Sequence, residues 1–166
     1  MATEKHILLS IGSNLGDRKQ NIEDAITMLR DCGLINDLKI SELYETEPFG
    51  NKELPAFLNN VVSFKTSLSA KEVFGLCKII ESNIGRVERG RWQSREIDLD
   101  ILLYDSDIIE DRELQIPHPQ MHLRNFVLIP ACDLAPFTIH PIFNKTIQQL
   151  LTECNDTCSV ELFKKK

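Results

Sequence analysis

The pattern of apolar and polar positions predicts a chain that alternates between short strands and amphipathic helices. Four segments combine apolar or alternating residues with flanking turn residues and are predicted to be strands: residues 6–11, 38–45, 58–64 and 97–104. Two longer segments carry apolar residues at helical spacing and are predicted to be helices: residues 15–29 and 69–83. The order strand, helix, strand, strand, helix, strand is typical of a ferredoxin-like α+β sandwich.

This architecture predicts one antiparallel sheet with both helices on the same face. The opposite face and its loops are then expected to be free for ligands, with C-terminal elements extending the fold. Those elements are predicted as a turn with a short edge strand, a proline-rich loop and two helices: residues 105–111, 115–123, 123–134 and 147–154. A chain of 166 residues can bury a sizeable core, so we expect a single domain over residues 1–166.

A glycine-containing turn, GSNLGDR at residues 12–18, follows the first strand. A turn between a strand and a helix is a common phosphate-binding place. This one lacks the Lys-Ser/Thr of a P-loop and the spacing of a dinucleotide-binding loop. The favoured interpretation is structural: Gly12 ends the strand, and Ser13 or Asn14 caps the helix.

Charge and cysteine content exclude several classes of protein. The net charge is −6, which disfavours nonspecific nucleic-acid binding through a basic surface. The five cysteines are odd in number and lack metal-ligand spacing, so reduced and mostly buried thiols are expected. No apolar run approaches the length of a membrane span. We therefore expect a cytoplasmic protein without a nucleic-acid or membrane partner.

Against this acidic background, four of the eight arginines fall within ten residues: Arg86, Arg89, Arg91 and Arg95. Guanidinium groups bind phosphate oxygens as rigid forks and keep their charge. A solvated surface loop is the alternative, but four arginines without a lysine favour phosphate binding by a mobile lid. Trp92 within the window is equally compatible with stacking on a planar substrate and with anchoring the loop.

Two aspartates follow the arginines inside a predicted strand. Asp98 and Asp100 are two residues apart, so both side chains point to one side, roughly 7 Å apart at Cα. The alternating apolar residues take the core side: Ile97, Leu99, Ile101 and Leu103. Paired carboxylates repel each other and have raised pKa values unless a cation lies between them. The alternative is a solvated edge strand, but beside the arginines the pair predicts a magnesium–polyphosphate site.

Three further residues have two interpretations each. His118, between two prolines, is either a neutral donor to phosphate or an ordinary loop histidine. Phe126 is more often a core residue than a site residue. Asn59 is unusual inside a strand, and is either exposed on an edge strand or a reader of a ligand's hydrogen-bonding edge.

Several motifs together resemble the 6-hydroxymethyl-7,8-dihydropterin pyrophosphokinases of the folate pathway. The resemblance is strongest over residues 5–135 and rests on five segments in order: GSNLGDR (12–18), YETEPFG (44–50), FLNNVV (57–62), GRVERGRWQSREIDLDILLY (85–104) and IPHPQMHLRNFVLIP (116–130). It implies the ferredoxin-like fold and transfer of pyrophosphate from ATP to the pterin hydroxymethyl group, with AMP as the leaving product. Relatives often carry Gln at Lys78, Pro at Glu47 and Tyr at Phe57.

The resemblance also implies roles for individual residues. Asp98 and Asp100 would hold two Mg²⁺ ions, Arg86 and Arg95 would stabilise the transferred group, and Trp92 would help close the lid. The ATP site would contain Lys78, Glu81, Arg89, Arg91, Ile101, His118 and Arg124. Because the arginine loop is one residue shorter than in some bacterial members, Arg89 and Arg91 compete for one role there. The pterin site would contain Thr46, Glu47, Pro48, Phe49, Phe57, Asn59 and Phe126.

Two other functions are compatible with the predicted fold. A non-catalytic ferredoxin-like module would bind nucleotide without needing the aspartate pair. RNA binding by the sheet is less favoured, because the free face lacks the aromatic pair and lysines of an RNA-recognition module. The enzyme is expected to be a monomer that uses ATP and the pterin as substrates.

Overall fold

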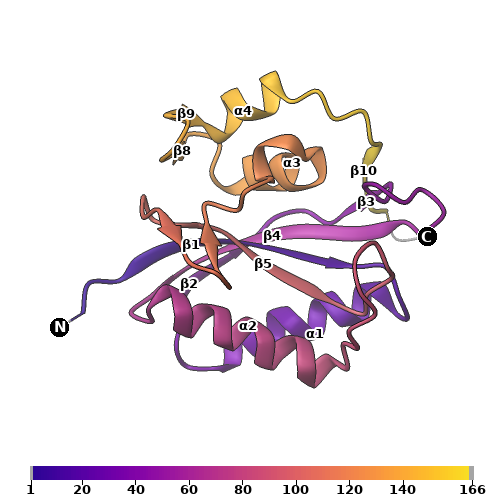
Figure 1. Cartoon of the computed structure of the whole chain (residues 1–166). Helices are drawn as coiled ribbons and strands as arrows, with labels where there is room; N and C mark the ends of the chain where they lie inside the picture. The colour runs from indigo at the N-terminus through magenta and orange to yellow at the C-terminus, as the bar shows by residue number, and fades with distance from the viewer. Residues whose placement is uncertain (1, 165–166) are drawn as a thin grey trace.

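A computed structural model describes residues 2–164 and has an antiparallel sheet at its centre (Figure 1). The long strands β1 (Lys5–Ser13) and β4 (Phe57–Thr66) lie side by side, and β5 (Asp98–Tyr104) pairs with the other edge of β1. The short strand β3 (Tyr44–Thr46) pairs with β4, and β10 (Val160–Leu162) pairs with β3. The α+β class with an antiparallel sheet is thus confirmed.

Two amphipathic helices cover one face of the sheet, α1 (Arg18–Asp31) and α2 (Ala70–Ile84) (Figure 1). The predicted inward residues of α1 are all buried: Ile22, Ala25, Ile26 and Leu29. Helix α2 begins with the predicted cap, since Ser69 and Glu72 form a reciprocal capping box. It ends at Gly85, whose φ of 100° suits glycine.

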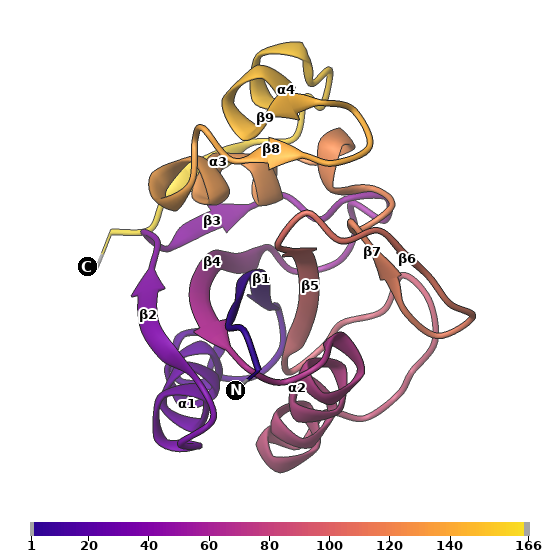
Figure 2. The same cartoon turned by 90° about the vertical axis from the view of Figure 1, so that its left-hand side faces the viewer.

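The opposite face is not free along its whole length. Helix α3 (Asn125–Leu134) packs on it, and α4 (Ile147–Glu153) lies beyond α3 (Figures 1 and 2). The sheet presents a second apolar surface here, to which Leu8, Val61 and Leu102 contribute. The prediction of an uncovered second face is therefore wrong for this half of the sheet. The other half stays open and forms the pocket described below.

The first strand and first helix differ from the prediction at their junction. Strand β1 continues through Gly12 to Ser13, so Gly12 is a strand residue. Helix α1 starts later, at Arg18, and neither Ser13 nor Asn14 caps it. Asp17 is the cap, because its Oδ1 accepts a hydrogen bond from Gln20 N at 3.0 Å.

The predicted strand 38–45 is two strands, β2 (Asn36–Ile40) and β3, which pair with successive stretches of β4. Ser41 bridges the interruption, since its Oγ accepts from Val61 N at 2.9 Å. A register shift where β1 meets β5 also places Leu103 in the cluster under α3, although it was predicted on the helix-covered side.

Smaller elements complete the chain. They are β6 (Ile109–Glu110), β7 (Gln115–Ile116), a 3₁₀ turn (Met121–Leu123), β8 (Ile139–His140) and β9 (Lys145–Thr146). The hairpin β8–β9 and the strand β10 were not predicted. The five cysteines are free thiols, but only Cys77 is buried, so the expectation of mostly buried thiols is wrong. Among residues 2–164, no helix is long and apolar enough to cross a membrane.

Candidate active site

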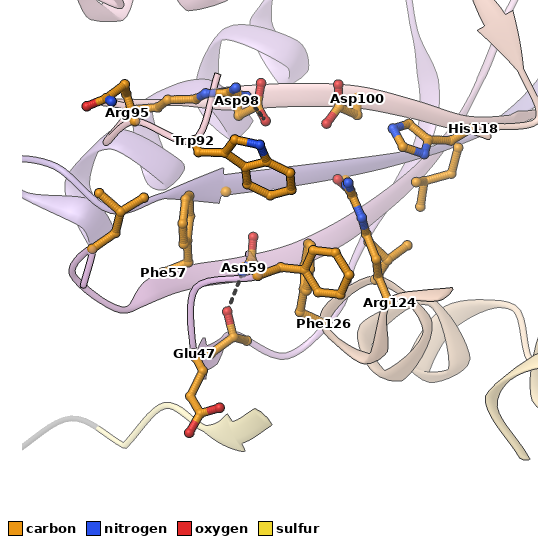
Figure 3. A pocket seen from close by; sticks show the side chains of 18 residues that line it. Glu47, Phe57, Asn59, Trp92, Arg95, Asp98, Asp100, His118, Arg124 and Phe126 are labelled. Atoms are coloured by element: carbon orange, nitrogen blue, oxygen red, sulfur yellow. Dashed lines mark hydrogen bonds and ion pairs between the residues drawn. The ribbon is translucent and has the colours of Figure 1, made fainter. Parts of the chain in front are cut away.

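The open half of the second sheet face forms a pocket bordered by α3 and two loops, residues 46–56 and 86–97 (Figure 3). Its volume is about 130 Å³. Twelve of the predicted site residues line it: Thr46, Glu47, Phe49, Phe57, Asn59, Trp92, Arg95, Asp98, Asp100, His118, Arg124 and Phe126. Residues separated by up to 80 positions in sequence therefore share one cavity.

Asp98 and Asp100 stand on the same side of β5, as the strand spacing predicts (Figure 3). Asp98 is held by two arginines of the preceding loop. Its Oδ1 lies 2.8 Å from Arg86 Nη1 and its Oδ2 lies 2.9 Å from Arg95 Nη1. The buried Glu81, 3% exposed, also forms an ion pair with Arg86, with Oε1 2.8 Å from Nη1. Arg86 is thus positioned between two carboxylates, a strong charge-assisted arrangement.

Within residues 2–164, Asp100 has no such direct partner. Burial, together with the neighbouring charges of Asp98 and Glu81, raises its pKa to about 7, although Arg124 and Arg95 act in the opposite direction. A carboxyl group in this environment gains from a nearby cation. No cluster of three or more potential metal-binding side chains occurs in the described chain. The pair fits Mg²⁺, which commonly takes one or two carboxylates and completes its shell with phosphate oxygens and water.

A buried amide forms the opposite wall. Asn59 is 8% exposed on the central strand β4, so the edge-strand interpretation is wrong. Its Nδ2 donates to Thr46 Oγ1 at 2.7 Å (Figure 3). Gly12 lies across from Asn59 in the β1–β4 pairing, and a Cβ at Gly12 would overlap Asn59 Oδ1. Glycine here makes room for the amide oxygen.

Aromatic rings fill much of the remaining space. Trp92 projects into the pocket from its loop, and its ring stacks on Phe49 with centroids 6.4 Å apart (Figure 3). Phe49 in turn lies 6.3 Å from Phe126, and the Arg124 guanidinium is 5.2 Å from the Phe49 ring centre. Trp92 is still 43% exposed and has a φ of 60°, so it caps the pocket instead of anchoring the loop in the core.

His118 is neutral in this setting. Burial lowers its pKa to about 4, and the charge of Arg124 acts in the same direction. Its Nδ1 accepts from Gln120 N at 3.2 Å, which leaves the ring proton on Nε2. The Arg124 guanidinium donates to Gln120 Oε1. A neutral N–H donor and a cation therefore stand side by side at this end of the pocket.

Asn14, in the turn after β1, and Arg18, the first residue of α1, hold both loops in place. Asn14 is 2% exposed, its Oδ1 accepts from Arg95 N at 2.7 Å, and its Nδ2 donates to Pro55 O at 3.3 Å. Arg18 donates to Ala56 O and to Glu45 Oε2, both at 2.8 Å. The turn after β1 thus serves the pocket by fixing main-chain positions.

The remaining predicted residues lie outside the pocket lining. Lys78 Nζ lies 3.2 Å from Glu81 Oε2, and Pro48 belongs to the pocket loop. The Ile101 side chain lies in the helix-covered core, so only its main chain can meet a nucleotide. Arg89 forms a two-pronged ion pair with Glu96 at 2.6 and 2.9 Å. Arg91 has no hydrogen bond or ion pair within residues 2–164.

Comparison with known proteins decides the family. A sequence model described as 7,8-dihydro-6-hydroxymethylpterin-pyrophosphokinase (HPPK) matches residues 8–136. The chain belongs to the HPPK family. The 2-amino-4-hydroxy-6-hydroxymethyldihydropteridine pyrophosphokinase of Aquifex aeolicus is 40% identical over 147 residues, 89% of this chain and 91% of that protein. Its Bacillus subtilis counterpart is 40% identical over 126 residues, 76% of this chain and 75% of that protein.

Solved structures support the same HPPK fold. The Plasmodium falciparum HPPK-DHPS crystallised with pteroate has a TM-score of 0.68 and 18% identity to this chain. The match covers 91% of this chain but only 42% of that longer chain. At this level of identity, the likeness concerns the fold.

Sequence reasoning missed part of the HPPK pocket. The additional lining residues are Ser10, Gly12, Leu54, Gln93, Leu102 and Val127. Ser10 and Gly12 carry a usable signal, since they alternate with the buried Leu9 and Ile11 on β1. The first strand was predicted to end before Gly12, so the alternation of Ser10 and Gly12 on one side of the strand was overlooked.

Proposed function

We propose that this chain transfers pyrophosphate from ATP to the hydroxymethyl oxygen of 6-hydroxymethyl-7,8-dihydropterin, producing AMP and the pterin diphosphate in a step of folate biosynthesis. The observation that carries the proposal is the pocket itself. Asp98 and Asp100 lie on one side of the pocket with Arg95 and Arg124, and Arg86 pairs with Asp98 from outside the lining. A buried amide with aromatic rings lies opposite. A pyrophosphokinase acting on a hydroxymethyl-dihydropteridine also agrees with the names of the HPPK relatives.

The aspartate side is proposed to receive the triphosphate. Asp98 and Asp100 would hold two Mg²⁺ ions, which supply charge neutralisation to the phosphate oxygens when bound. Phosphoryl-type transfer depends mainly on positioning and charge stabilisation. Arg86 and Arg95, now 2.8 and 2.9 Å from Asp98, are close enough to exchange this carboxylate for phosphate oxygens.

The rest of the triphosphate would lie toward Arg124 and His118. The neutral His118 can donate from Nε2 to a phosphate oxygen without adding charge. We assign the contested adenosine-phosphate contact to Arg91, because Arg89 is already engaged by Glu96. Lys78, Glu81 and the Ile101 main chain complete the proposed ATP site.

The opposite side is proposed to receive the pterin. Asn59 Oδ1 and Thr46 offer a fixed hydrogen-bonding edge, and a ligand that fails to match it would leave a buried amide unpaired. Phe57 and Phe126 line the same cavity and would stack on the flat ring, with Glu47, Pro48 and Phe49 from the adjoining loop. The hydroxymethyl group would then face the phosphates. We further propose a cytoplasmic enzyme without a membrane or nucleic-acid partner.

The test is product analysis after incubation with ATP, Mg²⁺ and 6-hydroxymethyl-7,8-dihydropterin. AMP and pterin diphosphate are expected in equal amounts. A pterin without the hydroxymethyl group is the matched control and is expected to give no AMP. Formation of ADP, or no nucleotide product, contradicts the proposal. Binding of a nonhydrolysable ATP analogue without any turnover would favour the non-catalytic module instead.

A further inference from the structure

The last part of the chain lies against the substrate side of the pocket. We call residues 154–162 the C-terminal strap. It runs from the end of α4 to β10, which forms the outermost strand beside β3 (Figure 1). It also borders the pocket loop, since a surface groove is lined jointly by Phe49, Gly50 and strap residues. The strap lies beyond residues 8–136, the part matched by the HPPK sequence model.

Asp156 ties the strap to the start of α3. Its Oδ2 accepts from Asn125 N at 2.9 Å, and its main-chain oxygen accepts from Asn125 Nδ2 at 2.6 Å. The residue at the ordinary cap position, Arg124, makes no side-chain cap. The carboxylate of Asp156, 31 residues further along the chain, therefore caps the N-terminus of α3 by accepting from Asn125 N. Arg124 and Phe126, which flank Asn125, both line the pocket.

The same aspartate orders the strap that holds the opposite loop. Its Oδ1 accepts from Cys158 N at 2.9 Å. The next residue, Ser159, exchanges two hydrogen bonds with Glu47: Glu47 N donates to Ser159 O at 3.0 Å, and Ser159 N donates to Glu47 Oε2 at 3.2 Å. Beyond it, Val160 pairs with Thr46 in the β10–β3 register.

We propose that Asp156 is a positioning residue that sets the spacing between the two walls of the pterin pocket. One wall is the start of α3 with Phe126, and the other is the loop with Thr46 and Glu47. Without the Asp156 carboxylate each wall keeps its own fold, but the strap loses its side-chain bonds to Asn125 N and Cys158 N and keeps only the main-chain bond to Asn125 Nδ2. The inference deepens the proposed function and rests on it, since it concerns the substrate half of the same pocket.

The experiment compares Asp156→Ala and Asp156→Asn with wild type. For Asp156→Ala we expect the KM for the pterin to rise about tenfold, with kcat and the affinity for a nonhydrolysable ATP analogue changed less than about twofold. Asp156→Asn keeps one acceptor oxygen, so its KM for the pterin should lie between those of wild type and Asp156→Ala. Glu153→Ala is the matched control: it removes a nearby surface ion pair with Lys145 and leaves the strap contacts intact, so its KM should equal wild type.

A second readout separates this inference from the proposed function. Trp92 is the only tryptophan and stacks on Phe49 of the loop that the strap holds, so its fluorescence reports on the loop without catalysis. Asp156→Ala is expected to shift the Trp92 emission, and Glu153→Ala is not.

The outcomes of the two measurements are distinguishable. If wild type makes no AMP, the proposed function fails while the Trp92 emission still tests the role of the strap. An unchanged pterin KM together with unchanged emission in Asp156→Ala overturns the inference, as does an equal loss of pterin and ATP affinity. If Asp156→Ala fails to fold, Asp156→Asn is judged by the same two measurements.

Discussion

Two aspartates on one side of one strand have different electrostatic surroundings. Asp98 is neutralised by direct ion pairs with Arg86 and Arg95, whereas burial and its acidic neighbours raise the pKa of Asp100. Each carboxylate therefore contributes differently before any ligand arrives. Asp100 is repelled by the neighbouring carboxylates, and a bound cation would reduce this repulsion. Asp98 fixes the positions of Arg86 and Arg95 through its ion pairs.

Replacement of either aspartate by alanine should abolish turnover while preserving the fold. Both side chains point into the pocket and away from the helix-covered core, so the core stays intact. We expect Asp98→Ala and Asp100→Ala to lower kcat by about 1,000-fold or more, because charge stabilisation dominates phosphoryl-type transfer. AMP formation measures the loss, and circular dichroism checks the fold. Wild-type rates in either variant would remove the magnesium assignment.

Gly12 makes a sharper residue-level prediction. Gly12→Ala places a Cβ where Asn59 Oδ1 lies, so the amide must turn and break its bond with Thr46. We expect the KM for the pterin to rise at least about tenfold. Gly75→Ala is the control, since nothing lies within 4 Å of a Cβ there and α2 should gain roughly 0.5–1 kcal/mol. Equal pterin KM values in the two variants would contradict this account of Asn59.

His118 predicts acid sensitivity of the fold. Its pKa is lowered from 6.5 to about 4 in the folded protein, so between these values the unfolded chain binds more protons. Stability contributed by the neutral histidine is therefore present above the unfolded pKa and is lost as pH falls toward the folded one. From about pH 7 to about pH 5, wild type should lose roughly 2 kcal/mol more unfolding free energy than His118→Gln. Urea unfolding at both pH values measures the difference, and parallel losses would refute it.

At the scale of elements, the loop of residues 86–97 is held at two points. Asn14 fixes the main chain at Arg95, and Glu96 grips Arg89. The cation of Arg89 lowers the pKa of Glu96 to about 2, so this pair persists across ordinary pH. Between these attachments, Trp92 and Arg91 are the exposed tip.

This geometry predicts that Trp92 moves when substrates bind. The cavity of about 130 Å³ is smaller than the ~300 Å³ of a typical small-molecule pocket, and Trp92 is one of its walls. We expect saturating pterin with a nonhydrolysable ATP analogue to change tryptophan emission, because the ring must leave Phe49. Trp92→Phe should abolish the signal. Constant tryptophan emission with both ligands bound would contradict movement of Trp92 and show that the pocket admits both ligands in its present form.

Helix α2 could be predicted from the local sequence pattern, whereas the short strands β2, β3 and β10 could not be delimited in that way. Helix α2 was predicted from the cap Ser69 to its last turn, because its capping box and apolar spacing lie within the segment itself. The break between β2 and β3 depends on Ser41 bonding to Val61, which is distant in sequence. Strand β10 is equally dependent on its partner β3. Short edge strands carry too little periodicity to identify alone.

At the scale of the whole molecule, we predict a monomer. Helices of the same chain cover one face of the sheet and the α3 half of the other, and the net charge of −6 opposes self-association. Light scattering is expected to give the chain mass of 19.0 kDa. A species of twice that mass would point to the exposed apolar residues around the β8–β9 hairpin, such as Phe137 and Ile139, as an interface.

The sequence by itself determined the order of the main elements, the shared direction of Asp98 and Asp100 and the local concentration of arginines. Each of these depends on residues close together along the chain, where strand and helix periods operate. Only the tertiary structure decided that α3 closes half of the second face, that Gly12 makes room for Asn59 and that Arg89 pairs with Glu96. It also decided the unequal surroundings of the two aspartates. Burial comes from residues far apart in sequence, and the ion pairs of Arg86, Arg89 and Arg95 depend on how the loop before β5 folds, so no strand or helix period contains them.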